Sequence, residues 1–196
     1  MKKPHRRPAP IFLDRDGTLI EEVDFLSSLG EMRLIPGAAA AVRDANRAGR
    51  PVIVVTNQSG VARGYFTEGF ARQSGVHLRG LLGATNARLD GYYYCPYHPD
   101  GLPPYNLNHP DRKPSDGMIL RARKDLHLNL RGGWMIGDRA SDLDTGAEHG
   151  LIPLLVRTGY GKETETRLSG DFPRRGGRVF DALADAIRWI LAEKGC

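Results

Sequence analysis

The stretch P-I-F-L-D-R-D-G-T-L, residues 10–19, decides the fold of this chain of 196 residues. Its apolar run leads directly into Asp14 and Asp16, which Gly17 and Thr18 follow at once. In a strand, side chains alternate with period two, so both carboxylates lie on the same side of the chain where it leaves the sheet. Two like charges that close repel each other unless a cation or a proton lies between them. The pattern therefore favours a divalent cation with oxygen ligands, Mg²⁺ foremost, over a plain Asp-Gly turn.

Two further apolar runs also end in polar residues. The run V-I-V-V-T at residues 52–56 leads into Asn57, Gln58 and Ser59. The run W-M-I at residues 134–136 leads into G-D-R at 137–139, and the basic R-K-P lies between the two runs at 112–114. Open α/β sheets bind their ligands at the carboxyl ends of the strands. These polar ends therefore predict one site at one edge of a sheet.

Strand-then-helix units repeat along the chain, which predicts an α/β fold with a doubly wound, mainly parallel sheet flanked by helices. We expect strands at 9–13, 52–55, 91–94, 134–136 and 152–156, and helices at 36–48, 67–81, 116–126 and 141–148. Thr67 is the expected N-cap of the second helix. Residues 159–178 are interpreted as a surface loop, Val179 and Phe180 as a short edge strand, and Asp181 as the N-cap of a closing helix whose buried face is Leu183, Ile187, Ile190 and Leu191.

Four motifs together resemble the haloacid dehalogenase superfamily: D-R-D-G-T at 14–18, T-N-Q-S-G at 56–60, Lys113, and G-D at 137–138 with Asp142. The phrases V-V-T-N-Q-S-G-V-A-R-G at 54–64 and Y-Y-C-P-Y-H-P at 93–99 resemble its small capless phosphatases, which act on heptose bisphosphate or histidinol phosphate. The resemblance implies a Rossmann-like core without a cap domain. It also implies a basic tail at 1–8 and a single phosphatase domain at 9–196.

The resemblance assigns roles to particular residues. It implies that Asp14 is a nucleophile that forms an aspartyl-phosphate, that Asp16 is the acid and then the base, and that Thr56 and Lys113 bind the transferred phosphoryl group. Mg²⁺ would be held by Asp14, Asp138 and the backbone carbonyl of Asp16, with Asp142 orienting this shell. The substrate-binding residues would be Glu22, Asn57, Gln58, Ser59, Arg112 and Arg139, of which Arg112 suits a second phosphate.

The loop before R-K-P departs from the relatives, which commonly carry four zinc ligands there. Only Cys95 is kept, while Tyr97, His109 and Asp111 occupy the other ligand positions. Cys95, His98, His109 and Asp111 could form a substitute site, since zinc accepts N, S and O ligands. Structural zinc sites favour thiolates, however, so zinc is not expected as a cofactor.

The resemblance therefore implies a Mg²⁺-dependent phosphatase that converts heptose 1,7-bisphosphate to heptose 1-phosphate, with histidinol phosphate as the alternative substrate. The net charge of +5 also raises the alternative of a nucleic-acid end phosphatase, and a regulator without turnover is a further one. The basic residues lack interleaved aromatic residues, so nucleic acid is not expected as a partner. With two cysteines, no apolar run of membrane length and no signal-peptide pattern, we expect a cytoplasmic monomer without membrane attachment.

Overall fold

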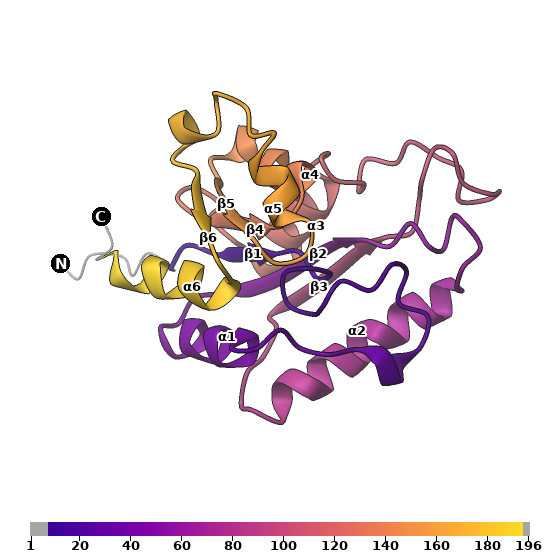
Figure 1. Cartoon of the computed structure of the whole chain (residues 1–196), viewed down its shortest axis with the longest axis horizontal. Coiled ribbons are helices and arrows are strands. Elements are labelled where there is room, and N and C mark those ends of the chain that lie inside the picture. Colours follow the sequence, from indigo (N-terminus) through magenta and orange to yellow (C-terminus); the bar gives the residue numbers. More distant parts are fainter. Residues whose placement is uncertain (1–7, 194–196) are drawn as a thin grey trace.

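The fold is built around one parallel sheet, seen in the computed structural model, which describes residues 8–193 (Figure 1). Its strands lie in the order β3-β2-β1-β4-β5-β6. Their bounds are β1 Ile11–Leu13, β2 Val52–Asn57, β3 Gly91–Cys95, β4 Trp134–Gly137, β5 Ile152–Val156 and β6 Arg178–Phe180. Every neighbouring pair is parallel. This confirms the predicted doubly wound α/β class, including the short edge strand.

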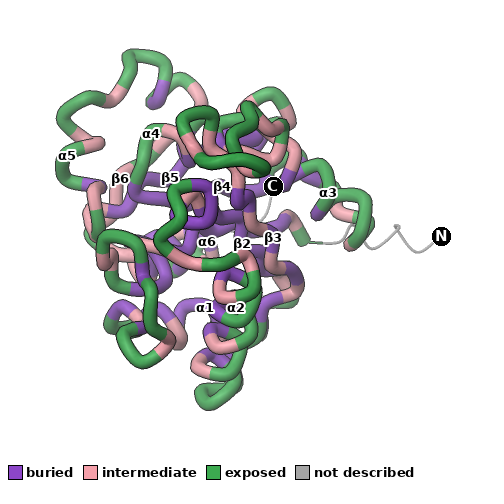
Figure 2. The backbone as a smooth tube through the Cα atoms, turned by 90° about the vertical axis from the view of Figure 1, so that its right-hand side faces the viewer, coloured by how far each residue is buried: buried purple, intermediate pink, exposed green. Residues whose placement is uncertain are grey.

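Helices cover both faces of the sheet. On one face lie α1 Ala38–Arg47, α2 Glu68–Gly83 and α6 Leu183–Ala192; on the other lie α3 Gly117–Leu126, α4 Ala140–Asp144 and α5 Gly161–Glu165 (Figure 1). The alternation of β1 creates both cores, since Ile11 and Leu13 pack on the first face while Phe12 packs with Met118 and Ile119 on the second. Buried residues accordingly follow the strands, as Figure 2 shows.

The order of the strands reverses at β1. The chain proceeds from β1 to β2 and β3 in one direction, then crosses to β4 and continues to β5 and β6 in the other. The carboxyl ends of β1 and β4 therefore border the crevice in which doubly wound sheets bind ligands. Asp14 follows β1, and Asp138 follows β4. The chain thus brings to this crevice two carboxylates that are far apart in sequence.

The predicted start of α2 is confirmed, whereas the predicted end of α4 is wrong. Thr67 does cap α2, because its hydroxyl accepts from the backbone N–H of Phe70 at 3.1 Å. The helix expected at 141–148 instead ends at Asp144 and is followed by a 3₁₀ turn, Ala147–His149, because Gly146 has φ +77° and donates its N–H to Asp116.

The C-terminal third differs from prediction at two points. The expected surface loop at 159–178 contains α5 and a 3₁₀ turn, Pro173–Arg175, and it buries Phe172 against Leu143 and Leu155. Asp181 is not the N-cap of α6, which is Ala182; its carboxylate instead accepts from Arg157 at 2.7 Å. The predicted buried face of α6 is nevertheless present, with Leu191 only partly buried.

Two further predictions concern the N-terminal tail and attachment to a membrane. The predicted basic tail falls almost wholly on residues 1–7, which lie outside the described residues. Within residues 8–193, no helix is both long enough and apolar enough to cross a membrane.

Candidate active site

Three buried carboxylates meet at the crevice between β1 and β4. Ligand atoms of Asp14, Asp138 and Asp142 all lie within 4.8 Å of one another. The backbone N–H of Asp14 bonds to the carbonyl of Ile136 at 2.9 Å, which ties the exit of β1 to β4. Asp142 reaches the cluster from α4, where its carboxylate accepts from the backbone N–H of Arg139 at 3.0 Å. The predicted convergence of acidic strand ends is therefore present, with Asp142 as a full member.

The charges of this cluster call for a cation. Burial, together with the nearby carboxylates of Asp14 and Asp142, raises the pKa of Asp138 to about 8. Burial also raises the pKa of Asp14 to about 6, although Lys113 acts in the opposite direction. One carboxylate oxygen of Asp138, Oδ1, is buried with no hydrogen-bond partner among residues 8–193. A set of oxygen donors with excess negative charge and an unused buried oxygen fits a hard divalent cation.

Two glycines leave room for the carboxylate of Asp138. Gly17 and Gly159 have φ +74° and +55°, and a Cβ on either residue would collide with this carboxylate. The carboxylate is held between them by the backbone N–H of Tyr160, which donates to Oδ2 at 2.8 Å. Gly17 belongs to the first motif, but no sequence signal pointed to Gly159. Its role follows only from the return of the chain after β5.

Lys113 supplies the balancing positive charge. Its Nζ lies 2.7 Å from Asp14 Oδ1 and 2.6 Å from Asp142 Oδ1, and its side chain is 2% exposed. Although burial alone would lower the pKa of Lys113, these two carboxylates raise it, so the amine stays charged. Asn57 holds the backbone of Lys113 at both ends: its Oδ1 accepts from the N–H at 3.0 Å and its Nδ2 donates to the carbonyl at 3.1 Å. Asn57 thus positions Lys113 and also lines the cavity, and its predicted contact with the substrate stays a prediction.

Asp16 is turned toward a buried arginine, Arg15, that no sequence pattern indicated as functional. The Arg15 guanidinium donates to both oxygens of Asp16, at 3.0 and 2.8 Å, and its other N–H groups bond to Gln58 and Ser74. Gln58 Nε2 also donates to Asp16 at 3.0 Å and to the Thr56 hydroxyl at 2.9 Å. The buried Thr56 is therefore joined to Asp16 through Gln58.

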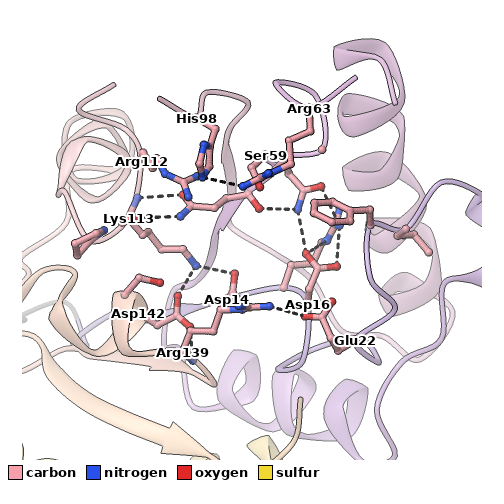
Figure 3. Close-up of a pocket in the computed structure, with 18 of the residues that line it drawn as sticks. Asp14, Asp16, Glu22, Ser59, Arg63, His98, Arg112, Lys113, Arg139 and Asp142 are labelled. Carbon is pink, nitrogen blue, oxygen red and sulfur yellow. Dashed lines mark hydrogen bonds and ion pairs between the residues drawn. The ribbon is translucent and has the colours of Figure 1, made fainter. Parts of the chain in front are cut away.

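A cavity of about 510 Å³ opens above this centre, and its lining is drawn in Figure 3. It is lined by most of the predicted residues: Asp14, Asp16, Glu22, Asn57, Gln58, Ser59, Arg112, Lys113 and Arg139, together with Asp142. Thr56 and Asp138 are buried and are not among the residues that line it. The lining also includes Phe25, Arg63, Phe66 and His98, which were not predicted individually as substrate contacts. Sequence patterns could not find them because they lie in loops without regular periodicity.

Glu22 and Arg139 pair at one side of the cavity. Their charged groups are 3.7 Å apart, and the guanidinium of Arg139 lies 3.8 Å from the centre of the Tyr160 ring. Burial raises the pKa of Glu22 to about 7, as does the nearby Asp16, while Arg139 opposes the shift. A carboxyl group so placed can accept from a sugar hydroxyl or, when protonated, donate to one.

The four residues considered as a substitute zinc site all have other partners. Cys95 is buried with its Sγ 4.0 Å from the carbonyl of Tyr97, and the His109 ring stacks on the Tyr97 ring with centroids 4.3 Å apart. Asp111 pairs with Arg121 at 2.6 Å, and His98 contacts Arg63. Packing and ion pairs therefore hold this loop in the described structure, and the expectation that the protein works without zinc stays a prediction.

Comparisons with known proteins agree with this geometry. Residues 11–81 match the family model described as haloacid dehalogenase-like hydrolase, and residues 111–186 match a second model described as HAD-hydrolase-like. The chain is 39% identical to the D-glycero-beta-D-manno-heptose-1,7-bisphosphate 7-phosphatase of Haemophilus influenzae, covering 91% of this chain and 94% of the relative. It is 38% identical to the D-glycero-D-manno-heptose-1,7-bisphosphate 7-phosphatase of Thermosynechococcus vestitus, covering 94% and 95%.

A solved structure is similar over nearly the whole chain. It is the D,D-heptose 1,7-bisphosphate phosphatase from B. bronchiseptica, complexed with magnesium and phosphate. The TM-score is 0.83 at 31% identity, and the match covers 95% of this chain and 99% of that one.

Proposed function

Because this chain belongs to the haloacid dehalogenase-like hydrolases and is a phosphatase, we propose that it removes the 7-phosphate of D-glycero-D-manno-heptose 1,7-bisphosphate with the aid of Mg²⁺. The observation that carries this proposal is the buried pair of Asp14 and Lys113, 2.7 Å apart, at the base of a cavity that is wide enough for a phosphorylated sugar. The names of the relatives support the choice of sugar.

The reaction starts at Asp14. One oxygen of its carboxylate forms a bond to phosphorus as the bond from phosphorus to the sugar oxygen breaks, and Asp16 gives that oxygen a proton. Asp16 then removes a proton from water, which attacks phosphorus and releases inorganic phosphate from Asp14. Lys113 neutralises charge on the phosphoryl group, assisted by the hydroxyl of Thr56. Mg²⁺, held by Asp14, Asp138 and the Asp16 backbone carbonyl, would supply further positive charge when bound.

The remaining pocket residues act on the rest of the substrate. We assign the sugar hydroxyls to Glu22, Gln58 and Ser59, with Arg139 beside Glu22, and a second phosphate to Arg112. All of them line the cavity. The same proposal includes a single domain at 9–196 that works as a monomer.

A substrate panel tests the proposed function. We expect kcat/KM for heptose 1,7-bisphosphate to exceed that for histidinol phosphate by at least about 100-fold, because loss of charged phosphate contacts costs about 2–3 kcal/mol. A 3′-phosphorylated oligonucleotide should be poorer still. The measurement is release of inorganic phosphate by one purified preparation. A higher kcat/KM for histidinol phosphate or for the oligonucleotide would reject the heptose assignment.

Removal of the metal should abolish activity. It should also make the stability of the folded protein decrease as pH rises. The raised pKa values of Asp14 and Asp138 mean that the folded, metal-free protein favours the protonated carboxyl groups. Its stability should therefore fall as pH rises from about 4 to about 8, since both groups ionise more easily when unfolded. Mg²⁺ replaces those protons, so it should raise the melting temperature more at pH 8 than at pH 5.5.

Thermal unfolding in EDTA and in excess Mg²⁺, at both pH values, makes this measurement. Phosphate release before and after chelation provides the activity arm, and readdition of Mg²⁺ should restore it. Full activity after exhaustive chelation, or an equal gain in melting temperature at both pH values, would contradict the proposed site.

A further inference from the structure

Three cationic or nitrogen-bearing side chains gather at the end of the cavity remote from Asp142. Arg63 comes from the loop after β2, while His98 and Arg112 come from the loop between β3 and α3, and all three line the cavity (Figure 3). An Arg63 guanidinium nitrogen lies 3.1 Å from His98 Nε2. The two loops are joined by the N–H of Leu102, which donates to the carbonyl of Ala62 at 2.6 Å. The group is thus held in place before any ligand binds.

His98 faces two donors and can accept from only one of them while neutral. The backbone N–H of Asp100 points at Nδ1 from 3.1 Å, and Arg63 points at Nε2 from 3.1 Å. A neutral imidazole carries one proton, so one of its nitrogens is itself a donor. If Nδ1 accepts from Asp100, then Nε2–H faces the N–H of Arg63 without an acceptor. An anionic oxygen beside these two groups would accept from both.

No carboxylate of the described residues supplies the anionic acceptor that Arg63 and His98 lack. Among residues 8–193, neither Arg63 nor Arg112 has a carboxylate within ion-pair distance. Arg112 donates one N–H to the carbonyl of Tyr97 at 3.2 Å, and its planar guanidinium has further donors to offer. Asp100 lies 3.9 Å from His98 Nδ1, on the side away from Arg63, and its side chain is 85% exposed. Burial, Arg112 and Arg63 lower the pKa of His98, and only the exposed Asp100 opposes them, which fits a site with more positive than negative charge.

We propose that Arg63 and His98 bind the second phosphate of the substrate together with Arg112, and thereby select bisphosphates over monophosphates. This inference rests on the proposed function and extends it to two residues outside the four motifs. His98 would donate from Nε2, and Arg63 and Arg112 would donate from their guanidinium groups. The transferred phosphoryl group would lie at Asp14 and Lys113, so the cavity would hold one phosphate at each of two basic positions.

Two substrates that differ only in the second phosphate test this: heptose 1,7-bisphosphate and heptose 7-phosphate. In the wild type, kcat/KM should be higher for the bisphosphate. Arg63→Met keeps the apolar stem and should reduce the ratio of the two values by about 10- to 100-fold, mainly through KM for the bisphosphate. His98→Asn keeps an acceptor for the Asp100 N–H but removes Nε2, and should reduce the ratio about 5-fold or more.

Arg47→Met is the matched control, because Arg47 is an exposed arginine of α1 outside the cavity. Its ratio should equal that of the wild type. Ratios within about twofold of the wild type in both Arg63→Met and His98→Asn would overturn the inference, as would a wild type that does not prefer the bisphosphate. Failure of the proposed function looks different: the wild type would then hydrolyse p-nitrophenyl phosphate but neither heptose phosphate, or none of the three.

Discussion

Asp14→Asn should lower turnover of heptose 1,7-bisphosphate by at least about 1,000-fold, because the neutral amide cannot attack phosphorus. The fold should survive the change. The Asn side chain is nearly isosteric and its oxygen can still accept from Lys113, which lies 2.7 Å from Asp14 Oδ1. The change also removes the repulsion between the carboxylates of residues 14 and 138, which raises the pKa of Asp138 in the wild type. The metal-free variant should therefore melt no lower than the wild type.

Phosphate release and thermal unfolding of the same preparation measure both parts of this prediction. Asp44→Asn is the matched control, since it makes the same chemical change in a half-exposed residue of α1 that pairs with Arg43. Mass spectrometry must first show that no deamidation has restored the aspartate. If more than a few per cent of activity then remains, Asp14 is not the nucleophile.

The main features of the sheet could be predicted because they depend on short local patterns. The strands β1, β2 and β4 are runs of apolar residues that end in polar ones, and parallel packing forces those ends to one edge. Asp14 and Asp138 could therefore be placed together from the sequence. Lys113 lies 99 residues from Asp14, and periodicity gave no reason to join them. The family resemblance placed Lys113 at the same site, as a residue that binds the phosphoryl group, but the ion pair itself was not predicted.

The features that could not be predicted depend on contacts between distant loops. Gly159 matters because the chain after β5 returns beside Asp138, and the meeting of Arg63 with His98 depends on two loops that join at Ala62 and Leu102. The end of α4 at Asp144 depends on a contact between Gly146 and the distant Asp116. Glycines stand at residues 146 and 159, but the partners that give them these roles, Asp116 and Asp138, are set by tertiary packing and not by the neighbouring sequence.

The contacts of the Asp16 side chain are likewise set by distant residues, Gln58 among them. The second prediction concerns this carboxyl group. Asp16→Asn should slow hydrolysis of heptose 1,7-bisphosphate by about 100- to 10,000-fold, the usual contribution of a general acid. An alkoxide is a poor leaving group, so the sugar oxygen needs a proton as its bond to phosphorus breaks. The nitrophenolate of p-nitrophenyl phosphate leaves without one. Formation of the phosphoryl-enzyme from the aryl substrate should therefore be slowed far less.

The comparison of the two substrates in rapid-mixing experiments separates the acid step from the later attack of water, in which Asp16 serves as base. Arg15 gives a second way to disturb the same carboxyl group, since it donates to both Asp16 oxygens and is itself held by Ser74 at 2.7 Å. Ser74→Ala removes that acceptor without touching the cavity lining. If Arg15 positions Asp16, Ser74→Ala should reproduce a smaller version of the Asp16→Asn pattern, with the sugar phosphate slowed more than the aryl phosphate. Equal losses on both substrates in Asp16→Asn would show instead that Asp16 does not protonate the leaving oxygen.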